Sequence, residues 1–178
     1  EIHERLVGSE MCIRDSVSSL YDYVTGVEVG IGSNGRKNRG GHQMEALVEE
    51  HLKNACVEYY KEMYLTEIEN KWNIDLSAVS AKGTSTKRWD FVVKTKSKIF
   101  VIETNFYASS GSKLNEIARS YKMIAEEAKE IPNFEFVWIT DGAGWKDAKR
   151  NLEETFIVLE NLYNITDMEN GIFNRIFE

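Results

Sequence analysis

The sequence predicts one α/β domain in which a mixed β-sheet is flanked by helices on both faces, an α/β/α arrangement. Short runs rich in β-branched and aromatic residues at 91–93, 99–102 and 134–140 predict strands. Apolar residues repeat at helical spacing before, between and after these runs. With 178 residues, the chain is long enough for one domain with a sizeable core. This order of elements is typical of α/β proteins.

The composition is that of an ordinary globular protein, with a net charge of -7. A negative total argues against general binding of polyanions, although a local basic cluster still attracts nucleic acid. No apolar run approaches the roughly 18 residues of a membrane span, and no secretory signal is found. The two cysteines support neither a disulfide framework nor a thiolate metal site. We therefore expect a cytoplasmic protein without membrane contact.

The N-terminal segment shares no pattern with the rest of the chain. Residues 1–16 have neither a helical nor a strand period, and the string VGSEMCIRDS at 7–16 resembles translated sequencing-adapter sequence. We expect residues 1–16 to be a non-native leader and residues 17–178 to form the folded domain. A genuine but poorly ordered N-terminus is the alternative. In both cases the natural protein is expected to begin further upstream.

The first half of the domain is predicted to contain a basic loop followed by helices. The run at 32–41 is rich in glycine, arginine and lysine, which predicts a loop. A helix follows, and its apolar face is formed by Met44, Leu47, Val48, Leu52 and Ala55. A second helical stretch is expected around residues 64–71. The basic connection 82–88 then leads into the strands.

The runs 91–93 and 99–102 are separated by a polar turn, so they predict an antiparallel hairpin. If the turn is centred on residues 96 and 97, paired residue numbers sum to 193 and Asp90 lies opposite Glu103. Directly opposed side chains have Cβ atoms about 5 Å apart. Two carboxylates that close repel by roughly 3 kcal/mol at an effective dielectric constant of about 20. A divalent cation between them would turn this repulsion into a binding site.

The second half is predicted to be a helix, a buried strand and a last long helix. Ser112 is a plausible N-cap of the first helix, and Pro132 marks its end. The strand at 134–140 is reached through this helical crossover, so it should run parallel to the strand of Glu103. The apolar stripe of the crossover helix comprises Leu114, Ile117, Ala118, Tyr121, Ile124, Ala125 and Ala128, and that of the last helix Leu152, Phe156, Leu159 and Leu162.

Several motifs resemble those of one enzyme family. An aspartate followed, on the partner strand, by Glu-x-(polar) resembles the arrangement in PD-(D/E)XK nucleases. The motifs GGHQME (40–45), RWDFV (88–92), IETNFY (102–107), GSKLNEIARSYK (111–122) and WITDGAGW (138–145) together resemble the DpnII-like type II restriction endonucleases. The likeness extends from about residue 21 to the C-terminus. It implies a restriction-endonuclease-like fold, a mixed β-sheet flanked by helices.

The resemblance also implies a function. The expected activity is that of a Mg²⁺-dependent type II restriction endonuclease that cleaves double-stranded DNA at unmethylated GATC, as part of a restriction-modification system. Because the site is a palindrome, the expected assembly is a homodimer. The alternative is a catalytically inactive or non-dimerising DNA-binding fragment of such an enzyme. A structure-selective resolvase on the same fold is a weaker alternative, since the motifs indicate the restriction enzymes.

The resemblance assigns roles around the acid pair. Asp90 and Glu103 would hold Mg²⁺ together with the backbone carbonyl of Thr104, since magnesium prefers hard oxygen ligands. Asn105 is also placed in the catalytic site, but it departs from the pattern of the PD-(D/E)XK superfamily, in which this position is more often lysine. Asparagine can hold a water molecule but carries no positive charge. Lys113 could supply that charge, or it is simply a solvated lysine in the first turn of a helix.

Further residues are expected at the site or on DNA. Glu45, on the first helix, would touch the metal site through water or belong to a solvated face. A GxGxxG pattern at 30–35 is discounted as a dinucleotide site because a basic run, and not an apolar helix, follows it. The residues expected to contact DNA are Arg36, Lys37, Arg39, Lys87 and Arg88. The alternatives are a solvated linker at 32–41, and an ion pair of Lys87 or Arg88 with Asp90.

Overall fold

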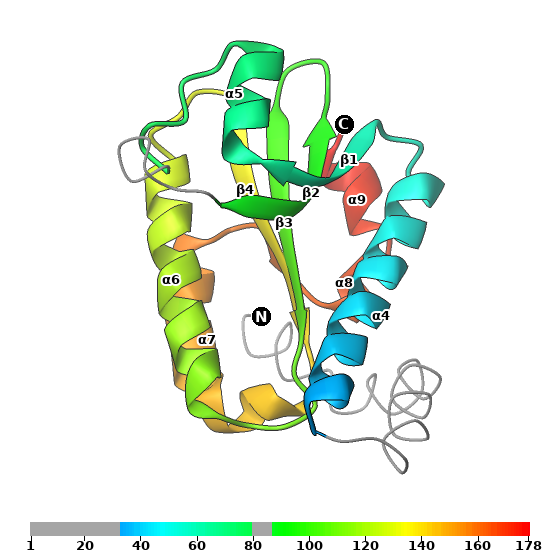
Figure 1. Cartoon of the computed structure of the whole chain (residues 1–178), viewed down its shortest axis with the longest axis vertical. Coiled ribbons are helices and arrows are strands. Elements are labelled where there is room, and N and C mark those ends of the chain that lie inside the picture. The colour runs from blue at the N-terminus through cyan, green and yellow to red at the C-terminus, as the bar shows by residue number, and fades with distance from the viewer. Residues whose placement is uncertain (1–32, 80–86) are drawn as a thin grey trace.

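The computed structural model describes residues 33–79 and 87–178, and in this part of the chain it shows one five-stranded sheet (Figure 1). The strand order is β1-β2-β3-β4-β5. The strand β3 lies in the middle, antiparallel to β2 and parallel to β4. The strands are β1 (Tyr59–Tyr64), β2 (Arg88–Lys94), β3 (Ile99–Phe106), β4 (Phe134–Asp141) and β5 (Leu162–Tyr163). The sheet is therefore mixed, as the sequence predicted.

Helices cover both faces of the sheet, which confirms the α/β/α arrangement. In Figure 1, α6 and α7 lie on one side of the strands, and α4, α8 and α9 lie on the other. The short helix α5 directly follows β1, and a 3-10 helix, η1, directly precedes α7. The helices are α4 (Ser33–Asn54), α5 (Leu65–Trp72), α6 (Ser112–Ala128), η1 (Ala143–Ala148), α7 (Lys149–Val158), α8 (Ile165–Glu169) and α9 (Ile172–Ile176).

The middle strand shows why there are two cores. Successive side chains of a strand point to opposite faces. Ile99 and Val101 accordingly pack in the core on the α6 side, whereas Phe100 and Ile102 pack in the core on the α4 side. All four are at most 4% exposed. A strand that is buried on both faces has a continuous apolar run, and this is the pattern seen in the sequence.

The predicted register of the hairpin is confirmed. Phe91 pairs with Ile102, and the next two pairs of the same register follow towards the turn. The predicted parallel strand is confirmed as well, because β3 and β4 pair from Ile99 and Phe134 to Phe106 and Asp141. The crossover helix α6 was also predicted, although its N-cap is Gly111 and not Ser112.

The expected loop at 32–41 is wrong, because α4 already begins at Ser33. Glycine disfavours a helix by about 1 kcal/mol relative to alanine, but packing against neighbouring elements commonly outweighs propensity. Gly40 is buried, and a Cβ atom on it would lie 3.9 Å from Cδ1 of Phe106 at the end of β3. This distance is an ordinary van der Waals contact, so Gly40 lies where α4 packs against the end of β3. The apolar face of α4, with Met44, Val48 and Leu52, is buried in the core on this side of the sheet.

The predicted last helix is too long at its C-terminal end. The structure ends α7 at Val158, with Leu159 extended as its C-cap. Leu162 belongs to β5, where it pairs with Trp138. Leucines buried in a short strand and in a helix are indistinguishable by apolarity alone. The strands β1 and β5 and the short helices α8 and α9 were not predicted.

Two glycines allow β4 to turn into η1 beside the end of β3. Gly142 has a φ of 117°, and a Cβ atom there would lie 2.2 Å from the carbonyl oxygen of Tyr107. A Cβ atom on Gly144 would lie 2.5 Å from the carbonyl oxygen of Ser109. The amide of Gly144 donates a hydrogen bond to the Tyr107 carbonyl at 2.8 Å. The backbone of this turn therefore packs directly on the segment that leaves β3.

We predict that Gly144→Ala lowers the free energy of unfolding by about 1–3 kcal/mol, because the added methyl group meets backbone that cannot move aside easily. Gly41→Ala is the matched control, since a Cβ atom there meets nothing within 4 Å. In α4 it should raise stability by up to about 1 kcal/mol. Urea unfolding of the three proteins measures both effects, and equal stability of Gly144→Ala and the parent protein would refute the close packing.

Candidate functional site

The acid pair lies where two paired strands separate. The ladder between β2 and β3 extends as far as Phe91 and Ile102, while β3 continues beside β4 to Phe106. Asp90 and Glu103 are the next residues on the two strands. The predicted register is thus confirmed up to the residues directly before the acid pair, and the opposition of the two acids themselves stays a prediction.

The carboxylate of Asp90 binds the backbone of the neighbouring strand. The amide of Thr104 donates to Asp90 Oδ2 at 2.7 Å, and the Thr104 hydroxyl donates to the same oxygen at 3.2 Å. The carboxylate therefore satisfies a strand amide beyond the end of the ladder. Burial raises the pKa of Asp90, and the hydrogen bonds from Thr104 oppose this rise. Both bonds use Oδ2, so with respect to residues 33–79 and 87–178 Oδ1 remains open to a further ligand.

The regular alternation of β2 is broken at Asp90. Trp89 packs in the core on the α6 side and Phe91 in the core on the α4 side, although residues two apart in a regular strand share a face. On β1, Glu62 lies between the residues paired with these two and has a φ of 53°. The charge of Asp90 raises the pKa of Glu45 on α4 and also that of Glu103 on β3. Asp90 therefore acts electrostatically on acids of two different elements.

Glu103 is held by a cation and a hydroxyl group. Its side chain is buried, the hydroxyl of Tyr121 on α6 donates to Oε2 at 2.6 Å, and the ammonium of Lys87 lies 2.9 Å from Oε1. Burial raises the pKa of Glu103; the charge of Lys87 opposes this rise and that of Asp90 adds to it. The ring of Tyr121 packs edge-to-face against that of Trp138, with 4.9 Å between the ring centres. This contact fixes the position of the Tyr121 hydroxyl.

The structure places Asn105 against the core. Its carboxamide oxygen accepts a hydrogen bond from Nε1 of Trp138 at 2.9 Å. This bond anchors the side chain and supplies no charge. The catalytic role expected for Asn105 stays a prediction.

The structure brings Glu45 near the pair. Glu45 is half-buried on α4, 3.7 Å from His42, and its pKa is raised by burial first and by the charge of Asp90 second. It is therefore more than a member of a solvated face.

The other expected basic residues are placed differently. Lys113 is exposed in the first turn of α6, and within the described part of the chain no contact joins it to Asp90 or Glu103. Arg88 is half exposed and pairs with Glu62 at 3.3 Å. The side chains of Arg36, Lys37 and Arg39 lie outside what the structure describes, so their contact with DNA stays a prediction.

Sequence reasoning missed two residues of this site. Tyr121 was assigned to the apolar stripe of a helix, and only its hydroxyl group signalled a further role. Lys87 was expected to contact DNA or to pair with Asp90, whereas the structure pairs it with Glu103. The partner of a side chain depends on tertiary packing, so the sequence pattern could not identify it.

A second acidic residue of α4 has a structural role. Glu49, which accepts hydrogen bonds from Lys61 at 2.6 Å and Tyr59 at 2.9 Å, joins α4 to β1. The hydrogen bond from Lys61 is the largest cause that lowers the pKa of Glu49 to about 2. It lies one helical turn from Glu45, so the two acids of α4 have different surroundings.

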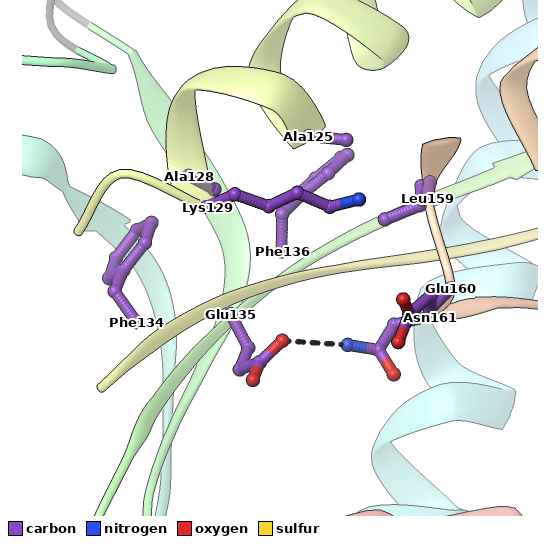
Figure 2. Close-up of a pocket in the computed structure, with 9 residues that line it drawn as sticks. All are labelled: Ala125, Ala128, Lys129, Phe134, Glu135, Phe136, Leu159, Glu160 and Asn161. Atoms are coloured by element: carbon purple, nitrogen blue, oxygen red, sulfur yellow. Dashed lines mark hydrogen bonds between the residues drawn. The ribbon is translucent and has the colours of Figure 1, made fainter. Parts of the chain in front are cut away.

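A cavity lies elsewhere in the described part of the chain. It has a volume of about 310 Å³ and is lined by residues of α6, β4 and the segment after α7. Figure 2 shows the hydrogen bond between Glu135 and Asn161 on its border, and Lys129 extending towards Leu159. None of the expected site residues lines it. The cavity is therefore separate from the acid pair.

The donor set suits a hard cation with few protein ligands. Across residues 33–79 and 87–178, no three His, Cys, Asp or Glu side chains are grouped closely enough to hold a metal ion. The donors on offer are the carboxylates of Asp90 and Glu103 and the carbonyl of Thr104. Since the amide and carbonyl of one strand residue point to the same side, that carbonyl is directed away from β4 and towards Asp90. Mg²⁺ usually retains several waters and needs only one or two carboxylates, so these residues fit it.

The helices of the described part of the chain include none that is both long and apolar enough to cross a membrane.

Comparison with known proteins identifies the family of the chain. The family model described as DpnII restriction endonuclease matches residues 7–175. The chain belongs to this family.

Individual relatives agree with the family. The chain is 54% identical to "Type II restriction enzyme DpnII" of Streptococcus pneumoniae over 164 residues, which are 90% of the chain and 57% of that protein. It is 44% identical to "Type II restriction enzyme MboI" of Moraxella bovis over 157 residues, 88% of the chain and 53% of that protein. It is 36% identical to "Type II restriction enzyme MjaIII" of Methanocaldococcus jannaschii over 168 residues, 90% and 57% of the two chains. The chain thus spans little more than half the length of these relatives.

We predict that Tyr121→Phe lowers the free energy of unfolding by about 1–3 kcal/mol, because it leaves Oε2 of a buried carboxylate without its donor. Tyr60→Phe is the matched control, since it removes a hydroxyl that donates to the exposed Glu58. That change should cost much less, because water replaces the lost donor. Urea unfolding compares the two, and equal losses would contradict the role of the buried bond.

We predict that Asp90→Asn raises the melting temperature at neutral pH in the absence of divalent cations. The pKa of Asp90 is raised in the folded protein, so ionisation opposes folding and stability is lost as the pH rises through the folded pKa. An asparagine oxygen can still accept the bonds from Thr104. The melting temperature should rise by about 2–4 °C for each kcal/mol gained in the free energy of unfolding. This gain should disappear when the pH is below the ordinary aspartate pKa of 3.8. Melting curves from pH 3 to 8 on the parent and the variant test it, and a gain that does not depend on pH would contradict the charge as its cause.

Proposed function

We propose that the chain carries the nuclease site of a Mg²⁺-dependent type II restriction endonuclease that cleaves double-stranded DNA at unmethylated GATC, within a restriction-modification system. The observation that carries the proposal is a pair of acids, the half-buried Asp90 and the buried Glu103, at the separation of β2 and β3 in a member of the DpnII restriction endonuclease family. Buried acids with raised pKa values are frequent in catalytic sites. The named relatives are type II restriction enzymes, which supports DNA as the substrate.

The residues of the site have separable roles in this mechanism. Bound Mg²⁺ would lower the pKa of an attacking water and neutralise charge on the phosphate. Asp90, oriented by Thr104, presents Oδ1 as a ligand. Glu103 is oriented by Tyr121 and Lys87, which hold its two oxygens in place. Glu45 adds negative charge beside Asp90 and can hold water at the edge of the site.

We further propose that the active form is a homodimer, since a palindromic site is matched by two-fold symmetry. The chain spans 57% of its relative from Streptococcus pneumoniae, so the surfaces that form a dimer in the longer proteins need not all lie in it. The second candidate function is therefore a DNA-binding fragment that is inactive or does not dimerise. Retention of both acids favours the enzyme.

We predict that Asp90→Asn reduces cleavage below detection while binding of GATC duplexes is unchanged or tighter, because the substitution removes a metal ligand and also negative charge near the phosphate. Asp147→Asn is the control, since Asp147 is exposed in η1. The assay incubates each protein with methylated and unmethylated plasmid, with and without Mg²⁺, beside a gel shift. Substantial cleavage by Asp90→Asn would refute the site, and cleavage of methylated plasmid would refute the methylation sensitivity.

We predict separable effects of the basic residues at the start of α4. If Lys37 contacts only phosphate, Lys37→Ala should weaken binding to every sequence and reduce the salt dependence by about one unit of slope. If Arg36 or Arg39 contacts a guanine edge, its replacement by alanine should cost roughly 1–3 kcal/mol of binding free energy on GATC and little on other DNA. Arg36→Ala or Arg39→Ala should therefore reduce the ratio of affinities for GATC and scrambled DNA. Binding isotherms on GATC and scrambled duplexes at several salt concentrations test this. Unchanged affinity and slope in all three variants would exclude this segment from the interface.

A further inference from the structure

The acid pair has a basic partner, Lys87, that comes from the segment directly before β2. The ammonium of Lys87 lies 2.9 Å from Oε1 of Glu103, and the Lys87 side chain is 24% exposed. Burial raises the pKa of Asp90, and the charge of Lys87 opposes this rise. Within the described residues, Lys87 is the basic side chain that forms an ion pair with a member of the acid pair. Among the basic side chains that the structure describes, Lys87 is therefore the one best placed to act where Asp90 and Glu103 act.

The position of Lys87 is determined by its surroundings. It lies directly before β2, and its carbonyl accepts a hydrogen bond from the amide of Leu65 at 3.1 Å. Its ammonium lies 4.6 Å from the ring centre of Trp89 and 5.5 Å from that of Tyr121. A cation over aromatic faces is stabilised electrostatically. Backbone, rings and carboxylate together hold one end of the side chain beside Glu103, while part of it remains accessible to a substrate.

The other candidates for a positive charge are less well placed. Asn105 is neutral, and its carboxamide oxygen accepts a hydrogen bond from Trp138. Lys113 is exposed on α6. Arg88 is directed to Glu62. Lys87 reaches the pair from the beginning of β2, so the charge that β3 lacks at Asn105 is supplied by the neighbouring strand.

We propose that Lys87 is a catalytic residue that places its positive charge on the phosphate to be cleaved; this inference rests on the proposed nuclease function. In the reaction, water forms a bond to phosphorus and the bond from phosphorus to the leaving oxygen breaks. The water proton passes to solvent, and the leaving oxygen takes up a proton. The ammonium of Lys87 stays protonated and donates a hydrogen bond to a phosphate oxygen, which gains negative charge as water adds. Once Glu103 serves as a metal ligand, its charge is shared, so the phosphate becomes the stronger partner of Lys87.

A simple phosphate anchor would behave differently. A lysine that binds phosphate equally before and during the reaction raises affinity and adds about one unit to the salt dependence of binding. A lysine that acts on the developing charge raises the rate at saturating DNA and leaves affinity unchanged. If Lys87 only supports Glu103, its substitution should have the same effect as removing another group that supports Glu103.

The experiment compares four variants with the parent protein. Lys87→Gln removes the charge and Lys87→Arg keeps it. Tyr121→Phe removes the other support of Glu103 without changing charge. Lys98→Gln is the matched control, because Lys98 forms a similar ion pair with Glu135 at 2.8 Å at the other end of β3. Single-turnover cleavage at saturating DNA and Mg²⁺, the salt dependence of duplex binding, and calorimetric titration with Mg²⁺ are measured for each.

The proposal predicts that Lys87→Gln lowers the single-turnover rate by about 100-fold or more, the size expected for loss of one charge-stabilising donor. Lys87→Arg should retain a higher single-turnover rate than Lys87→Gln. Tyr121→Phe should lose less of this rate than Lys87→Gln does, and Lys98→Gln should have the rate of the parent protein. Affinity and salt slope should not change. A near-parental rate of Lys87→Gln, a salt slope lowered by about one unit, or an equal loss in Tyr121→Phe would each overturn the proposal.

The Mg²⁺ titration decides the placement of Lys87 even if the parent protein cleaves no DNA. Removal of a like charge beside the metal should make Lys87→Gln bind Mg²⁺ several-fold more tightly than the parent. Unchanged or weaker Mg²⁺ binding would overturn the proposal. Absence of cleavage by the parent together with tighter Mg²⁺ binding by Lys87→Gln would instead contradict the proposed function and support the placement of Lys87 at the metal site.

Discussion

The hydrogen bond from the Thr104 amide to Asp90 is the interaction on which the candidate site depends. The ladder between β2 and β3 ends at Phe91 and Ile102, so the amide of Thr104 on β3 needs another hydrogen-bond acceptor. A carboxylate at Asp90 meets this need and is fixed by it. The same bond joins the end of the hairpin and positions the acid, so the fold and the site share one contact.

The site brings together acidic side chains whose ionised forms are destabilised by folding. Asp90, Glu103 and Glu45 all have raised pKa values, and burial is the largest cause for each. Lys87 and the Tyr121 hydroxyl offset part of this cost at Glu103. Sites that must hold a metal and a phosphate commonly carry such destabilising groups, because their ligands are absent during folding. The surrounding apolar cores on both faces of the sheet supply the stability that permits it.

The arrangement of the sheet explains why residues distant in sequence meet at one place. Glu45 comes from α4, Lys87 and Asp90 from the beginning of β2, and Tyr121 from the crossover helix α6. The crossover returns the chain to the sheet in parallel, so α6 passes over the face on which Glu103 lies. Side chains from these different elements converge near the end of β3.

The sequence by itself determined the hairpin register and the parallel strand β4, because short apolar runs joined by a short polar turn allow few pairings. The opposition of Asp90 and Glu103 that this register predicts stays a prediction. Only the tertiary structure decided that α4 begins at Ser33, that Leu162 lies in a strand, and that Lys87 pairs with Glu103. Local propensity favoured a loop for the glycine-rich run, and it was outweighed by the packing of α4 against the sheet through Met44, Val48 and Leu52. Which of several basic residues reaches a buried acid depends on backbone positions far apart in the chain, and no local pattern contains that information.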